Sequence, residues 1–300
     1  MNSLIAMIPS ILMIVSPILI TAIGGMISER AGVVNIALEG LMGIGAFTAA
    51  TVHYFLEPST QLSVPIALTT GLVAGLVFSL IHALASVTLN ADQVISGTGI
   101  NLLSIGATAF LAQIIFKMER TAPFRLGMMP GLWGIYPTAW IAFITVFIAW
   151  FILYKRPFGM RLRACGEHPQ AAASAGINVR KMRYIAVMIS GALAGLAGGC
   201  LVLTQTIQYT IYTINGAGFI ALAAVSFGRW LPTGVAGASM LFGTAVALAI
   251  YMVNIQSLRF LPSEFFSVMP YIITLITLIL FSGKEYAPRA AGQPYERSGS

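Results

Sequence analysis

Charged residues are scarce in this chain, and their scarcity excludes most classes of soluble protein. Only 8% of the 300 residues are charged, whereas 58% are hydrophobic and the mean hydropathy is +0.89. A soluble domain of this length needs far more polar surface. Several apolar runs reach the roughly 20 residues that a helix needs to cross a hydrocarbon core of about 30 Å. The composition therefore predicts membrane-spanning helices, because the alternating pattern of a membrane barrel is missing.

Cysteine and clustered catalytic residues are also rare. Cys165 and Cys200 are the two cysteines, and neither has the spacing of a metal site or of a disulfide framework. The sequence contains no GxxxxGK[ST] phosphate-binding loop and no cluster of His, Cys and carboxylate residues. Its cations lack the interleaved aromatic residues of a nucleic-acid surface. We therefore expect no enzyme active site, no cofactor, no metal site and no nucleic-acid partner in this chain.

Hydropathy predicts an all-α, polytopic membrane protein with about nine spans. The apolar segments are 3–26, 32–55, 62–89, 94–116, 137–154, 184–205, 216–227, 234–253 and 267–281. The segment 216–227 is short enough to be a half-helix or a re-entrant piece, so the range is eight to ten spans. We expect one transmembrane domain over 1–283, with a cytoplasmic loop at 155–183, and a flexible cytoplasmic tail over 284–300.

Positive charge is distributed unevenly among the predicted loops. If 216–227 crosses, the outer side holds four of the 16 basic residues, namely Lys117, Arg120, Arg125 and Arg259. If it turned back, Arg229 and the basic residues after 283 would lie outside, against the excess of Lys and Arg in cytoplasmic loops. We therefore predict an external N-terminus and a cytoplasmic C-terminus.

Polar residues within the apolar segments carry two possible meanings. Asn35 and Glu39 are four residues apart, so they share a helix face. Polar groups at membrane depth are costly, and they either line a pathway or gate or are satisfied by the backbone or a neighbouring helix. Both interpretations stay open. Asp92 precedes the fourth segment, where a helix cap is favoured slightly over a role in transport.

Glycines recur at helical spacing in two of the segments. Gly191, Gly195 and Gly199 form overlapping GxxxG steps, and Gly71 and Gly75 form another. Such steps let two helix backbones approach closely in lipid. Packing within the subunit is favoured over an interface between subunits.

The polar loop between the fifth and sixth segments contains a short predicted helix with proline near its start and glycine at its end. Pro157 and Gly159 break the preceding span. Glu167, His168 and Pro169 then open an alanine-rich stretch that stops at Gly176. A helix this short is marginal in water, and docking into a partner's groove would stabilise it. A solvated basic loop is the alternative.

Four blocks carry a resemblance to a known family. They read ERAGVVNIALEGLMGIGAF from Glu29, ADQVISGTGIN from Ala91, GMRLRACGEHPQAAASAGINVRKMRY from Gly159 and GFIALAAVSFGRWLPTG from Gly218. Together they extend over nearly the whole chain. The chain resembles the ABC-transporter permeases of the branched-chain amino acid and simple-sugar class. Within that class it is most similar to the nucleoside (guanosine-type) permeases that work with a binding lipoprotein.

The resemblance implies partners and a contact surface. It implies a multi-pass protein of the bacterial cytoplasmic membrane, surrounded by lipid, with an ATPase subunit that binds ATP and Mg²⁺. A second, related but different permease subunit and an extracytoplasmic solute-binding lipoprotein complete the complex. The short helix is then the coupling helix, flanked by Arg161, Arg163, Arg180 and Arg183. Its contacts to the ATPase are expected from Glu167, His168, Pro169, Ala171, Ala172, Ala175 and Gly176.

The apolar segments favour a neutral, hydrogen-bonding solute, because they offer Glu39 and otherwise neutral polar groups such as Gln113, Thr204, Gln205 and Asn215. Candidates for the path or its gate are Asn35, Glu39, Asn101, Phe47 and Phe219. The expected function is import of nucleosides by an ABC transporter, and the nucleoside assignment depends chiefly on the first block. Alternatives are the same machinery carrying a simple sugar or a branched-chain amino acid, and a secondary transporter working alone.

Overall fold

The computed structural model describes residues 2–253, 268, 272, 275–276, 279 and 286–295, with side chains from residue 7 onward. The helices are α1 (Asn2–Arg30), α2 (Leu38–Leu56), α3 (Ser63–Ala83), η1 (Leu84–Thr88), α4 (Gln93–Phe116), η2 (Leu132–Gly134), α5 (Pro137–Lys155), α6 (Pro157–Glu167), α7 (Pro169–Ser174), α8 (Val179–Gln205), α9 (Ala217–Phe227) and α10 (Pro232–Val253). The described residues form no strand beyond an isolated bridge between Arg120 and Thr210. The ninth predicted span, 267–281, lies outside the described residues apart from single positions.

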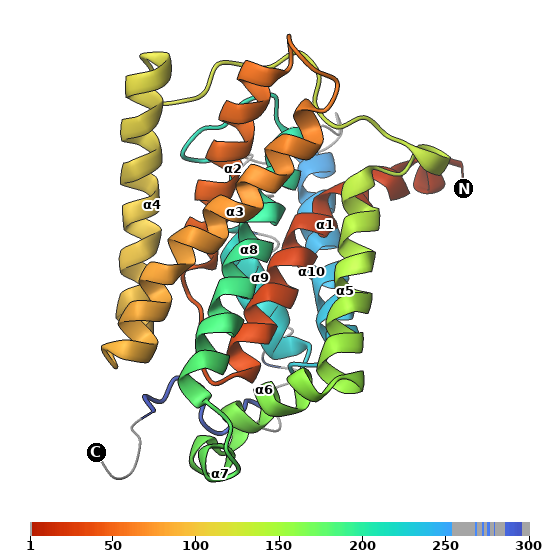
Figure 1. The fold of residues 1–300 in the computed structure, drawn as a ribbon. Coiled ribbons are helices and arrows are strands. Elements are labelled where there is room, and N and C mark those ends of the chain that lie inside the picture. Colours follow the sequence, from red (N-terminus) through yellow and green to blue (C-terminus); the bar gives the residue numbers. More distant parts are fainter. Residues whose placement is uncertain are drawn as a thin grey trace.

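The helices form one bundle with α1 and α8 at its centre (Figure 1). The apolar windows of α1 and α8 are 78% and 67% buried, whereas those of α3 and α4 are 22% and 28% buried. Helix α4 lies at the edge of the bundle, where Ile95, Leu102 and Phe110 are largely exposed. Exposed apolar side chains on long helices are typical of a surface that faces lipid or another subunit.

Within the described residues, six helices are long and apolar enough to cross a membrane: α1, α3 with η1, α4, α5, α8 and α10. The protein is therefore an all-α, polytopic membrane protein. Helix α9 is apolar but spans only 11 residues, and it occupies the short predicted segment 216–227.

The second predicted span begins later than its hydropathy indicates. Helix α1 ends at Arg30, and Gly32 follows in a left-handed conformation at φ +92° that only glycine adopts freely. The backbone N–H of Val33 donates to the Ser28 carbonyl across this turn. Helix α2 then starts at Leu38, so six residues of the apolar run form a break rather than a helix.

Glycines hold α2, α3 and α8 together at backbone contact. A Cβ atom on Gly45 would lie 2.2 Å from the Gly195 carbonyl oxygen, and one on Gly75 would lie 2.3 Å from the Gly191 carbonyl oxygen. A Cβ on Gly195 would likewise meet the Gly71 carbonyl oxygen at 2.3 Å. The favoured interpretation of the GxxxG steps, packing within the subunit, is confirmed.

Residues 286–295, within the segment predicted as a flexible tail, pack against the bundle. The Ala290 N–H donates to the Gly166 carbonyl at 2.9 Å, and the Gln293 carbonyl accepts from Arg183 Nη1 at 2.9 Å. The Ala290 and Tyr295 side chains are buried. Over this stretch the chain contacts α6 and α8.

Candidate functional site

The polar loop after α5 folds into two helices, not one. Sequence reasoning predicted a single short helix beginning at Glu167, but α6 extends from Pro157 to Glu167 and α7 from Pro169 to Ser174. Both begin with proline at a first helical position, where the missing N–H costs no hydrogen bond. Gly176, at φ +81°, ends the second helix as predicted. Helix α7 projects from one end of the bundle (Figure 1).

The side chains of α7 divide into an inner and an outer face. Ala172 is 4% exposed and belongs to the hydrophobic core, although it is among the residues predicted to contact the ATPase. Ala171 and Ala175 are exposed, and so is Gly176. His168 and Pro169 line a polar cavity of about 380 Å³ together with residues of the 286–295 segment. The residues of this helix and its ends that are exposed to a partner are His168, Gln170, Ala171, Ser174, Ala175 and Gly176.

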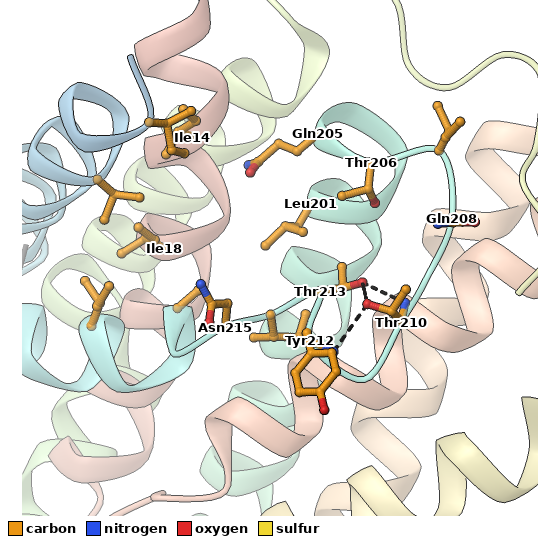
Figure 2. Close-up of a pocket in the computed structure, with 16 residues that line it drawn as sticks. Ile14, Ile18, Leu201, Gln205, Thr206, Gln208, Thr210, Tyr212, Thr213 and Asn215 are labelled. Atoms are coloured by element: carbon orange, nitrogen blue, oxygen red, sulfur yellow. Dashed lines mark hydrogen bonds between the residues drawn. The ribbon is translucent and has the colours of Figure 1, made fainter. Parts of the chain in front are cut away.

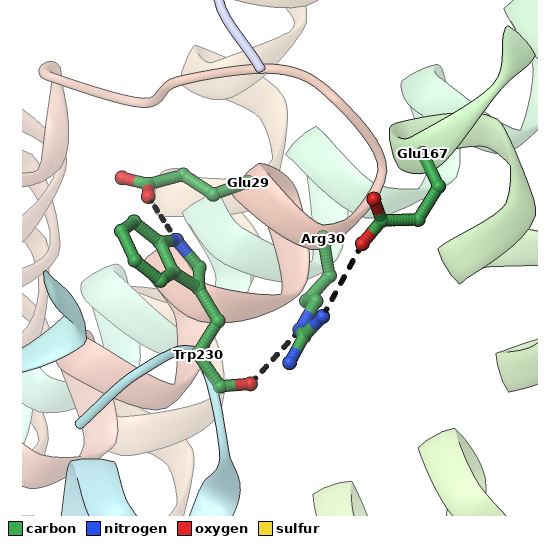
Figure 3. A network of polar contacts seen from close by, with 4 residues as sticks. All are labelled: Glu29, Arg30, Glu167 and Trp230. Atoms are coloured by element: carbon green, nitrogen blue, oxygen red, sulfur yellow. Dashed lines mark hydrogen bonds and ion pairs between the residues drawn. The ribbon is translucent and has the colours of Figure 1, made fainter. Parts of the chain in front are cut away.

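A chain of polar contacts links α1, α6 and the turn after α9 (Figure 3). The Trp230 indole N–H donates to the Glu29 carboxylate, and Arg30 Nε donates to the Trp230 carbonyl oxygen at 2.9 Å. Arg30 Nη1 lies 3.7 Å from Glu167 Oε1. Arg30 thus joins Glu167, the last residue of α6, to the turn after α9.

Two of the arginines predicted to flank the coupling helix lie against aromatic rings of this chain. Arg183 is fully buried beneath the 286–295 segment, with its guanidinium carbon 6.0 Å from the Tyr295 ring centroid. The Arg163 guanidinium carbon lies 4.6 Å from the Tyr154 ring centroid. The Arg183 cation is therefore covered by the C-terminal segment and is not exposed beside α7.

Glu39 lies at the first turn of α9. Its Oε1 accepts a hydrogen bond from the Gly216 N–H at 2.7 Å, and its Oε2 accepts one from the Gly218 N–H at 2.7 Å. A carboxylate at this position satisfies N–H groups that have no partner within the helix, and it complements the positive end of the helix dipole. Of the two open interpretations for Glu39, the structure supplies the backbone partners that the second one requires.

The other predicted path residues are placed in different surroundings. Asn101 accepts from the Gly40 N–H at 2.8 Å and donates to the Ile36 carbonyl at 3.0 Å, which holds the start of α2. Asn35 donates to Ser190 Oγ at 2.8 Å. Phe47 is buried against Tyr209, with ring centroids 5.6 Å apart. Phe219 is 49% exposed on α9. Their assignment to a path stays a prediction.

The helix-cap interpretation of Asp92 is confirmed. Its Oδ1 accepts from the Val94 and Ile95 N–H groups at 2.8 and 2.9 Å, at the start of α4.

A cavity of about 620 Å³ lies between α1, the end of α8, the loop 206–216 and α10 (Figure 2). Its polar wall is formed by Gln205, Thr206, Gln208, Thr210, Tyr212, Thr213 and Asn215. Its apolar wall includes Ile14, Ile18, Leu201, Ile220 and Val246. Gln205 and Asn215 were recognised from the sequence as neutral polar groups. The others were missed, although the run TQTIQYTIYTIN at 204–215 is rich in uncharged polar residues.

The cavity and α7 lie at opposite ends of α8. Helix α8 has 27 residues, which corresponds to a length of about 40 Å. It begins beside α7 and ends at Gln205, whose Nε2 donates to the Met13 carbonyl of α1 at 3.2 Å. None of the five predicted path residues lines this cavity.

The structure thus combines a bundle of apolar helices, a helix pair that projects from one end and a cavity without charged lining at the other. Residues 7–278 match the family described as branched-chain amino acid transport system / permease component, and the chain belongs to this family. It is 44% identical to the guanosine ABC transporter permease protein NupQ of Bacillus subtilis, over 96% of this chain and 95% of that protein. It is 36% identical to the nucleoside ABC transporter permease protein NupC of Lactococcus lactis, over 99% and 98%. The guanosine ABC transporter permease protein NupP of Bacillus subtilis is 27% identical, over 92% and 80%.

Proposed function

We propose that this chain is a permease subunit of an ABC importer that carries nucleosides across the bacterial cytoplasmic membrane. The observation that carries the proposal is the similarity, over nearly the full length of both chains, to permeases named for guanosine and nucleoside transport. The uncharged cavity supports a neutral solute. A simple sugar is the second candidate, because it also presents neutral hydroxyl groups to such a cavity.

The proposed orientation places α7 in the cytoplasm and the N-terminus outside, with nine spans. The distribution of charge supports it. Arg30, Arg229 and the 286–295 segment gather at the same end of the bundle as α6 and α7, as the contacts of Glu167 and Gly166 indicate. Helix α9 and the loop before it together connect the far end of α8 to the start of α10, so they complete one crossing in this scheme. Basic residues favour the cytoplasmic side.

In the proposed mechanism α7 is the coupling helix, and its exposed alanine face docks on an ATPase subunit that binds ATP and Mg²⁺. Closure of the ATPase subunits moves α7 and α6. The Glu167–Arg30–Trp230 contacts then transmit that displacement to α9, whose first residue borders the cavity. Glu39 holds the start of α9, and Arg30 contacts the turn after its end. A displacement of α9 would therefore alternate the cavity between outward-open and inward-open states.

The proposed complex contains a second permease of different sequence and an extracytoplasmic binding lipoprotein. Two Bacillus subtilis relatives, NupQ and NupP, are both named as guanosine permeases, and they differ strongly in their similarity to this chain. This pattern supports a pair of related but unequal permease chains, of which this one corresponds to NupQ.

Uptake by the reconstituted complex tests the proposal. The permease pair, the ATPase and the binding lipoprotein are placed in liposomes and supplied with labelled guanosine, adenosine, uridine, ribose or leucine. We expect uptake of nucleosides that requires ATP inside the vesicles. Uptake of ribose or leucine alone would assign the complex to another solute, and uptake without ATP would contradict the ABC mechanism.

A further inference from the structure

The cavity between α1, α8 and α10 has a chemistry that selects its ligand. We propose that the segment 205–215 is the solute-contacting wall of this subunit, and that it reads the heterocyclic base of a nucleoside through side-chain amides. The inference rests on the proposed function and adds residues and a ligand class to it. A volume of about 620 Å³ falls in the range of small-molecule sites, roughly 300–1,000 Å³.

Two amides of this wall have unused hydrogen-bonding capacity. In the described part of the chain, the side chains of Gln208 and Asn215 have no hydrogen-bond partner, and both line the cavity. Gln205 is engaged through its nitrogen alone, with the Met13 carbonyl. An amide offers a donor and an acceptor side by side, which is the pattern along the edge of a nucleobase. Neutral amides that line a cavity are therefore suited to a base edge.

The opposite wall is suited to the face of a ring. Ile14 and Ile18 on α1, Leu201 on α8 and Val246 on α10 present only aliphatic atoms. In Figure 2 the Ile14, Ile18 and Leu201 side chains project toward the space that Gln205 and Asn215 also face. A planar base can lie with its faces against the aliphatic groups while its edge meets the amides. A solute made only of hydroxylated carbons would leave this apolar wall without a matching surface.

The lack of charged lining residues and the position of Glu39 both disfavour two related classes of solute. No charged residue or histidine lines it among the described residues, so the ammonium and carboxylate groups of an amino acid would lose water without gaining partners. The start of α9 would otherwise attract a phosphate. Glu39 already occupies the Gly216 and Gly218 N–H groups there, and its negative charge repels an anion. The cavity therefore favours a nucleoside over a nucleotide or an amino acid.

Two conservative substitutions test the assignment. Asn215→Asp and Gln208→Glu keep the side-chain shape but replace an NH₂ donor with a charged oxygen. Asn215 is in the left-handed region at φ +48°, and aspartate is tolerated there. In the ATP-driven complex we expect the maximal rate of guanosine uptake to fall about three- to tenfold. The solute concentration that half-saturates uptake should not change, because the binding lipoprotein sets it.

The matched control is Gln61→Glu, which makes the same chemical change at an exposed site outside the cavity. Rates are normalised to the assembled complex measured by size-exclusion chromatography, and Asn215→Gly supplies a second variant that removes the amide without strain. Uptake rates equal to that of Gln61→Glu in all three variants would overturn the inference. So would a loss of uptake that tracks weaker binding of the lipoprotein. If the unmodified complex carries no nucleoside, the proposed function fails instead, whatever the variants do.

Discussion

Glu39 on α2 and Gly216 at the start of α9 are joined by a carboxylate-to-backbone hydrogen bond of 2.7 Å. The bond connects two helices that both begin within the bundle rather than at its ends. Each start leaves backbone N–H groups that lipid cannot satisfy. One carboxylate therefore holds α2 and α9 together beside the cavity.

Replacing Glu39 with Gln removes the charge and one of the two acceptor oxygens. An N–H group of α9 would then face an NH₂ group. We expect the free energy of unfolding to fall by about 1–3 kcal/mol, and uptake to slow because α9 borders the cavity. Thermal denaturation and ATP-driven uptake measure the two effects.

The matched control for that change is Glu57→Gln. The Glu57 carboxylate also accepts from two backbone N–H groups, those of Arg125 and Leu126, but away from α9. This variant should retain uptake. Equal uptake by the two variants would show that holding α9 is unimportant for transport.

The outer face of α7 should be sensitive to charge. Ala175→Asp places a carboxylate on the exposed surface, where it would lose water on docking without a partner. We expect the bundle to stay folded and ATP-driven uptake to fall at least about tenfold, as a loss of roughly 1.4 kcal/mol of docking energy implies.

Ser59→Asp is the control at an exposed site remote from α7. Ala172 is unsuitable for this test, since its side chain is buried and a charge there would damage the fold. Co-purification of the ATPase with each variant distinguishes lost docking from lost stability. Undiminished co-purification and uptake with Ala175→Asp would remove α7 from the contact.

The Trp230 contacts predict a variant that is poorly coupled. Trp230→Phe keeps an aromatic ring but removes the indole N–H that donates a hydrogen bond to the Glu29 carboxylate. The Arg30–Glu167 pair is partly exposed, so its own contribution to stability is small, about 0–1 kcal/mol. We expect Trp230→Phe combined with Glu167→Gln to lower the number of solutes carried per ATP hydrolysed. A ratio unchanged from the unmodified complex would contradict transmission through α9.

Glycine positions should differ sharply in their tolerance of a methyl group. Gly195→Ala would place a Cβ 2.3 Å from the Gly71 carbonyl oxygen, and we expect a loss of about 1–3 kcal/mol in the free energy of unfolding. Gly237 lies in α10 with nothing within 4 Å of the added atom. Gly237→Ala should be neutral or stabilising by up to about 1 kcal/mol, because alanine favours the helix. The melting temperatures of both variants test the packing of α3 against α8.

Cys165 should react slowly with alkylating reagents. It is buried in α6, and burial raises the pKa of its thiol, although the Arg183 cation opposes that shift. A raised pKa leaves less thiolate at neutral pH, and the thiolate is the reactive form. In a Cys200→Ala background we expect maleimide labelling to be much slower in the folded protein than in denaturant. Removing residues after 285 should accelerate it, because the 286–295 segment contacts α6 beside Cys165 through the hydrogen bond from the Ala290 N–H to the Gly166 carbonyl. Equal labelling rates with and without the segment would show that it does not cover α6.

The long spans were predictable because hydropathy over about 20 residues reflects a local requirement of the bilayer. Eight of the nine predicted segments coincide with helices, and the ninth lies outside the described residues. The break at Gly32 was not predicted, since an apolar run gives no sign of a turn that is set by a left-handed glycine. Helix α6 was not predicted for a similar reason, because a proline such as Pro157 can either end one helix or begin the next.

The candidate site was likewise predictable only in part from the sequence. The residues of α7 and the neutral polar groups Gln205 and Asn215 were found from the sequence, since proline and glycine at helix ends and amides beside apolar runs are visible in it. Their neighbours in the cavity were not found. Whether Gln208 lines a cavity, or Arg183 lies beneath a covering segment, depends on residues that are distant in the chain, such as Ile14 and Gln293.

The sequence by itself determined an all-helical membrane protein, the family to which it belongs and the loop that presents a short helix. Those properties follow from composition, from charge near the ends of apolar segments and from residues adjacent in the chain. Only the tertiary structure decided that Glu39 caps α9, that Ala172 faces inward and that a cavity without charged lining lies at the end of α8. The reason is physical, because each of these depends on backbone groups that distant helices bring within hydrogen-bonding or van der Waals distance.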